Sequence, residues 1–342
     1  MTGRGGLASA GVVVLAVAGQ SNAEGRAHPI GPELDPPDPR IAMWDWGTSS
    51  LRQATVPLSS RRMQDGLSIA TVVAREILAH EGVALVVIVN AAVGGSPLAR
   101  ANDRGTWRWG EGSLADGFVE AVRATIRLLA DRAPDAGADV RMLWHQGESD
   151  VDPVAYEREL DRLVAGVRER LELPELTVVL GGMVPEHVAQ EPRLAAIRAV
   201  HVDTPRRLRR TAYVDGIPCG GGSAGAADVL HYAREGAERL GRGMHAAHRR
   251  ALVNTEGSIP VPVMDLVASR RGTAVVASWS APLCRVTGFL VEHSADGERW
   301  IEASSSMETT AVLDGGVRSV RVTTLNEEGR SAPAVASVSG GA

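Results

Sequence analysis

The chain has 342 residues, enough for two domains at about 150 residues each, and its 44% hydrophobic and 23% charged residues are typical of globular proteins. A net charge of −5 at pH 7 gives no indication of a nucleic-acid or anionic-membrane partner, and no apolar run approaches the ~20 residues of a membrane span. Cys219 and Cys284 make neither a disulfide framework nor a zinc site, so we expect free thiols, with one bridge between the two domains as the alternative.

The first apolar run, VVVLAVA at residues 12–18, follows an arginine and several small residues and so resembles the core of a secretory signal. It leads directly into Gly-Gln-Ser-Asn at 19–22, a sequence that has the character of a functional turn. We therefore interpret the run as a buried first strand, and we predict neither a signal peptide nor a transmembrane segment.

Short apolar runs alternate with longer helical stretches from Val12 to Leu252. Further strands are predicted at 83–92, 139–146, 176–182 and 211–215. Helices are predicted at 65–82, 115–131, 160–171, 192–200 and from 234 onward. The residues Met-Trp-Asp-Trp at 43–46 are predicted to form a buried edge strand. This alternation indicates an α/β domain in which a parallel sheet carries helices on both faces.

The pattern changes after the linker at 251–263, because helical periodicity stops and only short strands remain. Turns at Asp296-Gly297 and Glu328-Gly329 separate these strands, as in an antiparallel sandwich. We therefore divide the chain into residues 1–253 and residues 254–342, with one β-sandwich in the second part.

The second part resembles a fibronectin type III domain. Trp279 matches that family's core tryptophan, and Phe289 and Val291 match its third strand, whereas Arg318 stands where the family usually has a tyrosine. The candidate core residues of this module are Trp279, Phe289, Trp300, Val320 and Val322. The resemblance implies an extracellular or virion-associated setting, with a glycan, virion or cell-surface partner for the module. The absence of a predicted signal peptide argues the other way, so the compartment is left open.

A serine ends the first strand of the α/β domain. Ser21 is flanked by Gly19, Gln20 and Asn22, which are common in tight turns, so a turn without chemistry is one interpretation. The other is a nucleophilic serine on a strand-to-helix turn, held at the carboxyl end of a parallel sheet.

A serine nucleophile needs a base, and His231 is the best candidate among the histidines. Asp228 lies three residues before it, where its carboxylate can orient the imidazole. The alternative is that Asp228 only caps the following helix. The pair follows the last predicted strand, so its loop should emerge at the same sheet edge as Ser21. Asp215, at the end of that strand, is a competing acid.

Two more loops should open on this edge. Gly94 and Gly95 follow one buried strand, and Gln146 follows another. Negative charge that develops on an acyl oxygen needs fixed hydrogen-bond donors, each of which lowers the activation barrier by about 3 kcal/mol. The N–H of Ser21, the N–H of Gly94 or Gly95 and the amide of Gln146 could supply them, although either loop could equally be a simple turn or helix cap.

Taken together and in this order, GQSNAEG, NAAVGGSPLA, WHQGESD and DVLH resemble the sialate O-acetylesterase-type branch of the SGNH hydrolases, which includes bacterial and plant carbohydrate acetylesterases. The resemblance implies a three-layer α/β/α, flavodoxin-like fold without a metal or other cofactor. It further implies a serine esterase that removes O-acetyl groups from a carbohydrate through an acyl-enzyme. Ser21 would be the nucleophile, His231 the base and Asp228 the acid, and Gly94 or Gly95 would line the oxyanion hole with Gln146.

Several other side chains near these motifs are candidates for binding. Trp107 and Trp109 could stack on a sugar ring, although burial under a loop is the commoner fate of tryptophan, and Glu148 could contact the substrate. His145 and Glu148 have a spacing found in metal sites, but no third ligand presents itself, so no metal is expected.

Three other functions share features with this sequence. An α/β-hydrolase is rejected because the Gly-x-Ser-x-Gly elbow is absent. A phage-tail or cell-surface binding protein with a weak or inactive hydrolase domain would fit the sandwich module. The third alternative is a short-chain lipase or thioesterase, and the lack of a long apolar lid segment weighs against this function.

Overall fold

The computed structural model describes residues 11–62, 65–132, 137–218, 228–257, 259–282 and 284–339. The chain separates into two compact units, one of Met1–Thr204 with Arg210–Val253 and one of Pro205–Arg209 with Asn254–Ala342. Cys284 is buried, and its Sγ accepts the N–H of Val261 at 3.4 Å, whereas Cys219 and most of the glycine-rich stretch around it lie outside the described residues.

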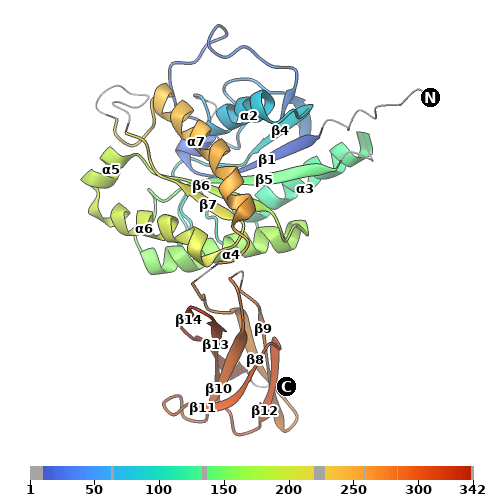
Figure 1. Ribbon diagram of the computed structural model, residues 1–342, viewed down its shortest axis with the longest axis vertical. Coiled ribbons are helices and arrows are strands. Elements are labelled where there is room, and N and C mark those ends of the chain that lie inside the picture. The colour runs from blue at the N-terminus through green and yellow to red at the C-terminus, as the bar shows by residue number, and fades with distance from the viewer. Residues whose placement is uncertain are drawn as a thin grey trace, which may run out of the picture. The chain divides into compact units, whose positions relative to one another are not determined.

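The first unit is built on a seven-stranded sheet with the order β3-β2-β4-β1-β5-β6-β7 (Figure 1). Its strands are β1 (Val12–Gly19), β2 (Ile41–Asp45), β3 (Ser50–Gln53), β4 (Leu85–Asn90), β5 (Ala138–His145), β6 (Thr177–Gly181) and β7 (Thr211–Val214). Neighbouring strands run parallel except β2 and β3, which are antiparallel, so the sheet is mixed at one edge. Three of the four residues predicted as an edge strand, 43–45, belong to β2, and Trp46 follows it. Strand β3 pairs with β2 and is the true edge.

Helices pack on both faces of this sheet, as predicted (Figure 1). They are α1 (Ser21–Glu24), α2 (Ile69–His80), α3 (Leu114–Arg132), α4 (Pro153–Leu171), α5 (Pro185–Gln190), α6 (Pro192–Arg207) and α7 (Arg234–Val253). Leu143 of β5 belongs to the core that α2 and α7 cover, whereas the next residue, Trp144, donates from its indole N–H to Tyr156 of α4 at 3.2 Å. Since successive side chains of a strand face opposite ways, the two helix layers lie on opposite faces. The α/β fold is confirmed.

Gly19 allows the carboxyl ends of β1 and β5 to meet. It has a φ of +132°, and a Cβ at this position would lie 2.0 Å from the carbonyl oxygen of His145. Only glycine has access to this conformation and this close approach. The loops after β1, β4 and β5, which carry Ser21, Gly94 and Gln146, therefore begin side by side.

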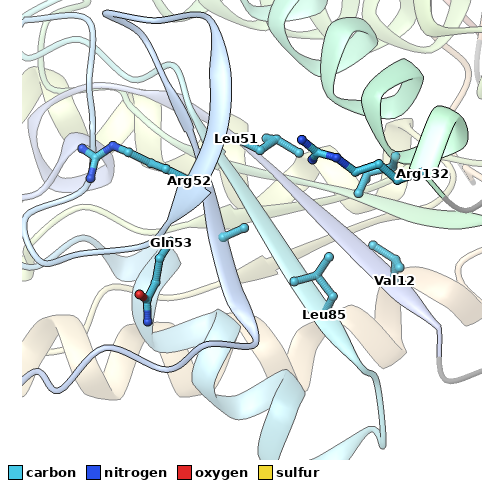
Figure 2. Close-up of a pocket in the computed structure, with 8 residues that line it drawn as sticks. Val12, Leu51, Arg52, Gln53, Leu85 and Arg132 are labelled. Atoms are coloured by element: carbon cyan, nitrogen blue, oxygen red, sulfur yellow. The ribbon is translucent and has the colours of Figure 1, made fainter.

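A cavity of about 300 Å³ lies at the opposite ends of the strands (Figure 2). Val12 and Leu85, which begin β1 and β4, line it with Leu51 of β3 and Arg132 of α3. Val12 is separated from Ser21 by the whole length of β1, about 25 Å at 3.3 Å per residue. This cavity is therefore unrelated to the predicted site.

The second unit is an all-β sandwich with the strand order β11-β10-β13-β15-β8-β9-β12, and β14 pairs with β13. The strands are β8 (Met264–Arg271), β9 (Ala274–Ser280), β10 (Gly288–Ser294), β11 (Ile301–Ser306), β12 (Thr310–Asp314), β13 (Ser319–Asn326), β14 (Gly329–Arg330) and β15 (Ala334–Ser339). In its core, Trp279 and Phe289 pack edge to face at 5.6 Å between ring centroids. Trp300 was wrongly assigned to the core: it is partly exposed, and the guanidinium of Arg321 covers its ring.

None of the helices in the described part of the chain has the length and hydrophobicity that a membrane crossing requires.

Candidate active site

The turn after β1 places Ser21 at the first residue of α1. The N–H of Gln20 donates to the carbonyl of His145 at 2.9 Å, which ties the turn to the end of β5. The carbonyl of Gln20 in turn accepts from the N–H groups of Ala23 and Glu24, both at 2.9 Å. Ser21 is 6% exposed, so its hydroxyl is held in a fixed place at the carboxyl edge of the sheet.

Ser21, His231 and Asp228 form one hydrogen-bonded chain. The Oγ of Ser21 lies 3.0 Å from Nε2 of His231, and Nδ1 of His231 lies 3.0 Å from Oδ2 of Asp228. Because a carboxylate accepts, Nδ1 carries the proton of the neutral ring and Nε2 is left to accept from the serine hydroxyl. The imidazole is 20% exposed, so a substrate can reach it.

The second oxygen of Asp228 organises the loop around the histidine. Its Oδ1 accepts the N–H groups of Leu230 at 3.0 Å and of His231 at 3.1 Å. Burial raises the pKa of this carboxyl, but the hydrogen bonds from the side chain and backbone of His231 outweigh it, and the net pKa lies below the ordinary value of 3.8. Asp228 is therefore a carboxylate at neutral pH, as an orienting acid must be.

The competing acid, Asp215, has other partners. Its carboxylate accepts from the guanidinium of Arg198 at 3.0 and 2.5 Å and from the hydroxyl of Tyr213 at 2.9 Å. These contacts, and not His231, account for its position.

The sequence offered the N–H of Gly94 or of Gly95 as a hydrogen-bond donor to a developing oxyanion. The two N–H groups have different partners in the structure. The N–H of Gly94 donates to Oε2 of Glu24 at 2.9 Å, so the expectation of a free donor is wrong for Gly94. Gly95 adopts a φ of +75°, and its N–H has no backbone acceptor among the described residues. Ser21 opens α1, where an N–H lacks an intrahelical partner.

The amide of Gln146 also differs from the expectation. Its Nε2 lies within hydrogen-bond distance of Asp150 Oδ2 at 2.6 Å, Gln20 Oε1 at 3.2 Å and the carbonyl of Ser96 at 3.3 Å. Both N–H groups are therefore engaged, and Gln146 is not a free oxyanion donor in this structure. It links the loops that follow β1, β4 and β5.

The two tryptophans offered as sugar platforms lie elsewhere. Trp107 is fully buried, and its indole N–H donates to Gly19 and Ser96. Trp109 lies against α4, where its N–H donates to the carbonyl of Arg162 at 2.9 Å and the guanidinium of Arg170 stacks 4.2 Å from the ring centroid. Neither ring is free to stack on a sugar.

Glu148, also offered as a substrate contact, points into the protein. Its side chain is 2% exposed, and Oε1 lies 3.9 Å from Nδ1 of His145, whose Nε2 lies 2.9 Å from the carbonyl of Gly182. No group of three or more His, Cys, Asp or Glu side chains that could hold a metal occurs within the described ranges.

Two buried carboxylates at the site were not predicted. Glu24 has no exposed side-chain surface and contacts Arg26 at 2.7 Å, and Asp150 accepts the N–H groups of Leu98 and Ala99 at 2.9 and 2.8 Å. Both lie within motifs singled out in the sequence, Glu24 in GQSNAEG and Asp150 in WHQGESD, and their place among small and polar residues was the available signal.

A family model described as SASA, a carbohydrate esterase and sialic acid-specific acetylesterase, matches residues 11–250. A solved structure of an Arabidopsis thaliana protein aligns with a TM-score of 0.55 and 21% identity over 70% of this chain and 98% of that chain, a likeness of fold. No curated protein matches the chain.

The sandwich has fibronectin III-like structural neighbours. A fibronectin type III-like protein from Clostridium thermocellum aligns over 24% of this chain and 95% of that chain, with 18% identity and a TM-score of 0.21. A human fibronectin type III domain aligns over 23% of this chain and 79% of that chain, with 15% identity and a TM-score of 0.21.

Proposed function

Because this chain belongs to the SASA family of carbohydrate esterases, and so is an acetylesterase of carbohydrates, we propose that it hydrolyses acetyl esters through an acyl-enzyme on Ser21. The observation that carries this mechanism is the chain of two 3.0 Å contacts from Ser21 through His231 to Asp228. The same three residue types in this geometry support nucleophilic catalysis on unrelated folds.

In the acylation step, Nε2 of His231 takes the hydroxyl proton of Ser21 as Oγ attacks the acetyl carbonyl. The resulting imidazolium is stabilised by the carboxylate of Asp228, and it then donates its proton to the departing sugar oxygen. In the deacylation step, a water molecule loses its proton to His231 and attacks the acetyl-Ser21 ester. His231 then returns that proton to Oγ of Ser21 as the ester bond breaks and acetate leaves.

The negative charge of the tetrahedral intermediate needs donors beside Ser21. The N–H groups of Ser21 and Gly95 are the candidates that have no competing acceptor among the described backbone groups. One such donor lowers the barrier of acyl transfer by about 3 kcal/mol. Glu24 and Gln146 support these donors by fixing the loops around them.

A panel of acetylated sugars and p-nitrophenyl esters of increasing chain length tests the proposal, with Ser21→Ala as the matched control. We expect hydrolysis of acetates, faster hydrolysis of p-nitrophenyl acetate than of the octanoate, and no effect of EDTA. A preference for the octanoate would favour the lipase alternative. Absence of ester hydrolysis would favour a binding protein with an inactive hydrolase domain.

The sandwich unit has a separate role in this proposal. Its core residues are its own, and the candidate active-site residues all lie in the first unit. We assign it to holding the enzyme near a glycan, virion or cell-surface target, where a second contact raises the effective concentration of substrate. Hydrolysis of a small ester should therefore not require the sandwich unit, whereas hydrolysis of an acetylated polysaccharide should require it.

A further inference from the structure

The side chain of Asn22, the neighbour of Ser21, bonds to the main chain on both sides of His231. Its Nδ2 donates to the carbonyl of Leu230 at 3.2 Å, and its Oδ1 accepts the N–H of Tyr232 at 3.0 Å. Asn22 is 4% exposed, so water has little access to compete for these groups. The two bonds fix the backbone of the histidine relative to the turn that carries the serine.

Glu148 determines which way the Asn22 amide faces. Oε1 of Glu148 accepts from Nδ2 of Asn22 at 3.3 Å within the buried interior. A carboxylate oxygen can only accept, so the NH₂ end of the amide must face Glu148 and Leu230. The carbonyl end is thereby directed at the N–H of Tyr232, the one group of this set that donates.

The loop around His231 depends on contacts of this kind. The N–H groups of Leu230 and His231 bond back to Asp228 within the same loop and so do not attach it to the sheet. The hydroxyl of Tyr232 donates to the carbonyl of Gly182 at 3.0 Å, which attaches the loop to the end of β6. The Asn22 bonds attach it to the nucleophile turn itself.

We propose that Asn22, oriented by Glu148, is a positioning residue that holds Nε2 of His231 within reach of Oγ of Ser21. This inference rests on the proposed function, because it assigns Asn22 to the same serine and histidine. Asn22 takes no part in proton transfer and is too buried to bind the sugar. Its loss should therefore lower kcat and leave KM almost unchanged.

The experiment measures kcat and KM for p-nitrophenyl acetate, together with the thermal midpoint, in the full chain. Asn22→Ala should lower kcat about 100-fold, since a displacement of about 1 Å at a reacting group has effects of this size. Val167→Ala, at a fully buried position on α4 away from the site, is the control for lost stability. It should lower the thermal midpoint and keep the wild-type kcat.

A second pair of variants covers the case in which Asn22→Ala does not fold. Asn22→Asp keeps the shape and the acceptor for Tyr232 but places an acceptor against Glu148 and Leu230, so kcat should fall at least about 10-fold. Adding Glu148→Gln supplies a new amide donor to the aspartate and should restore part of kcat. If the second change restores nothing, Glu148 does not orient residue 22 and that part of the proposal is wrong.

The failure of this inference is distinguishable from the failure of the proposed function. If Ser21→Ala keeps the wild-type rate, the serine mechanism itself is wrong. If Ser21→Ala is inactive while folded Asn22→Ala and Asn22→Asp keep the wild-type kcat, the mechanism stands and the positioning role of Asn22 is overturned.

Discussion

The carboxylate of Glu24 accepts the main-chain N–H of Gly94 at 2.9 Å, so the turn that carries Ser21 holds the Gly-Gly loop directly. The same carboxylate pairs with Arg26 at 2.7 Å and accepts from the hydroxyl of Ser60 at 3.1 Å. A buried charge is tolerated when it is paired and hydrogen-bonded in this way. The nucleophile and the loop beside it are therefore placed by one buried ion pair.

We predict that Gly94→Ala disrupts this arrangement. A Cβ at residue 94 would lie 2.9 Å from Nη2 of Arg26, 3.0 Å from Oε2 of Glu24 and 3.5 Å from Cβ of Ser21. The expected result is a fall in kcat/KM of about 100-fold through displacement of the reacting groups, measured with p-nitrophenyl acetate. Gly31→Ala, where an added Cβ meets nothing within 4 Å, is the control and should retain activity. A Gly94→Ala enzyme with the wild-type kcat/KM would contradict the prediction.

A second prediction concerns Asp35, which anchors the start of α7 just after His231. Its carboxylate accepts from both terminal nitrogens of Arg234 at 2.9 Å, and from Arg75 at 3.1 Å. Burial raises the pKa of Asp35, but the hydrogen bonds and charge of Arg234 outweigh it and hold the pKa below 3.8. The folded state therefore binds this proton less readily than the unfolded state does.

It follows that Asp35 adds stability that is fully present above its ordinary pKa and is lost as the pH falls through the lowered value. Asp35→Asn should lower the free energy of unfolding by about 2 kcal/mol at pH 7, because Arg234 loses the charge-assisted bonds to Asp35 and keeps only Glu238 as a carboxylate partner. Urea unfolding at a series of pH values measures the free energy of unfolding of both the wild type and the variant. The difference between wild type and variant should shrink as the pH falls below 3.8, and a constant difference would contradict the assignment.

The third prediction separates the two candidate acids. Asp228→Ala should lower kcat/KM strongly, although less than Ser21→Ala and His231→Ala, each of which should cost at least about 10³-fold. Asp215→Ala should have a small effect, because its partners are Arg198 and Tyr213. Should Asp215→Ala prove the more damaging of the two, the acid would have to be reassigned.

Much of the fold was predictable because the central strands are buried on both faces and therefore have continuous apolar sequences. The run at residues 85–89 is continuous and apolar, for example, and the turn after this strand contains the glycines of a motif. Strand β3 was missed because three of the four residues in Ser50–Gln53 are exposed and no apolar pattern marks them. With β3 unseen, β2 was placed at the edge.

The site was predictable where short spacing, or the shared edge of a parallel sheet that brings Ser21 and His231 together, carries information. Asp228 and His231 are three residues apart, so their pairing could be proposed from the sequence. The contact of Asn22 with Leu230 spans 208 residues and that of Gly94 with Glu24 spans 70, and no local pattern reports such distances. The burial of Trp107 was likewise decided by packing against Phe118 and Trp144 in three dimensions.

A fourth prediction tests the division of the chain. Because the sandwich has its own core around Trp279 and Phe289, we propose that residues 1–253 fold alone. A protein that ends at Val253 should be soluble and keep most of its activity on p-nitrophenyl acetate. It should lose activity on an acetylated polysaccharide. Loss of activity on the small ester would mean that residues 254–342 support the catalytic unit itself.

In the proposed mechanism, Ser21 carries the acyl group during turnover. The most direct measurement is mass spectrometry of peptides from enzyme that has been mixed with p-nitrophenyl acetate and quenched with acid during the burst. We predict an acetyl group on the peptide that contains Ser21 and none on the same peptide of the Ser21→Ala enzyme. An acetyl group on another residue, or rapid turnover by Ser21→Ala, would contradict the account.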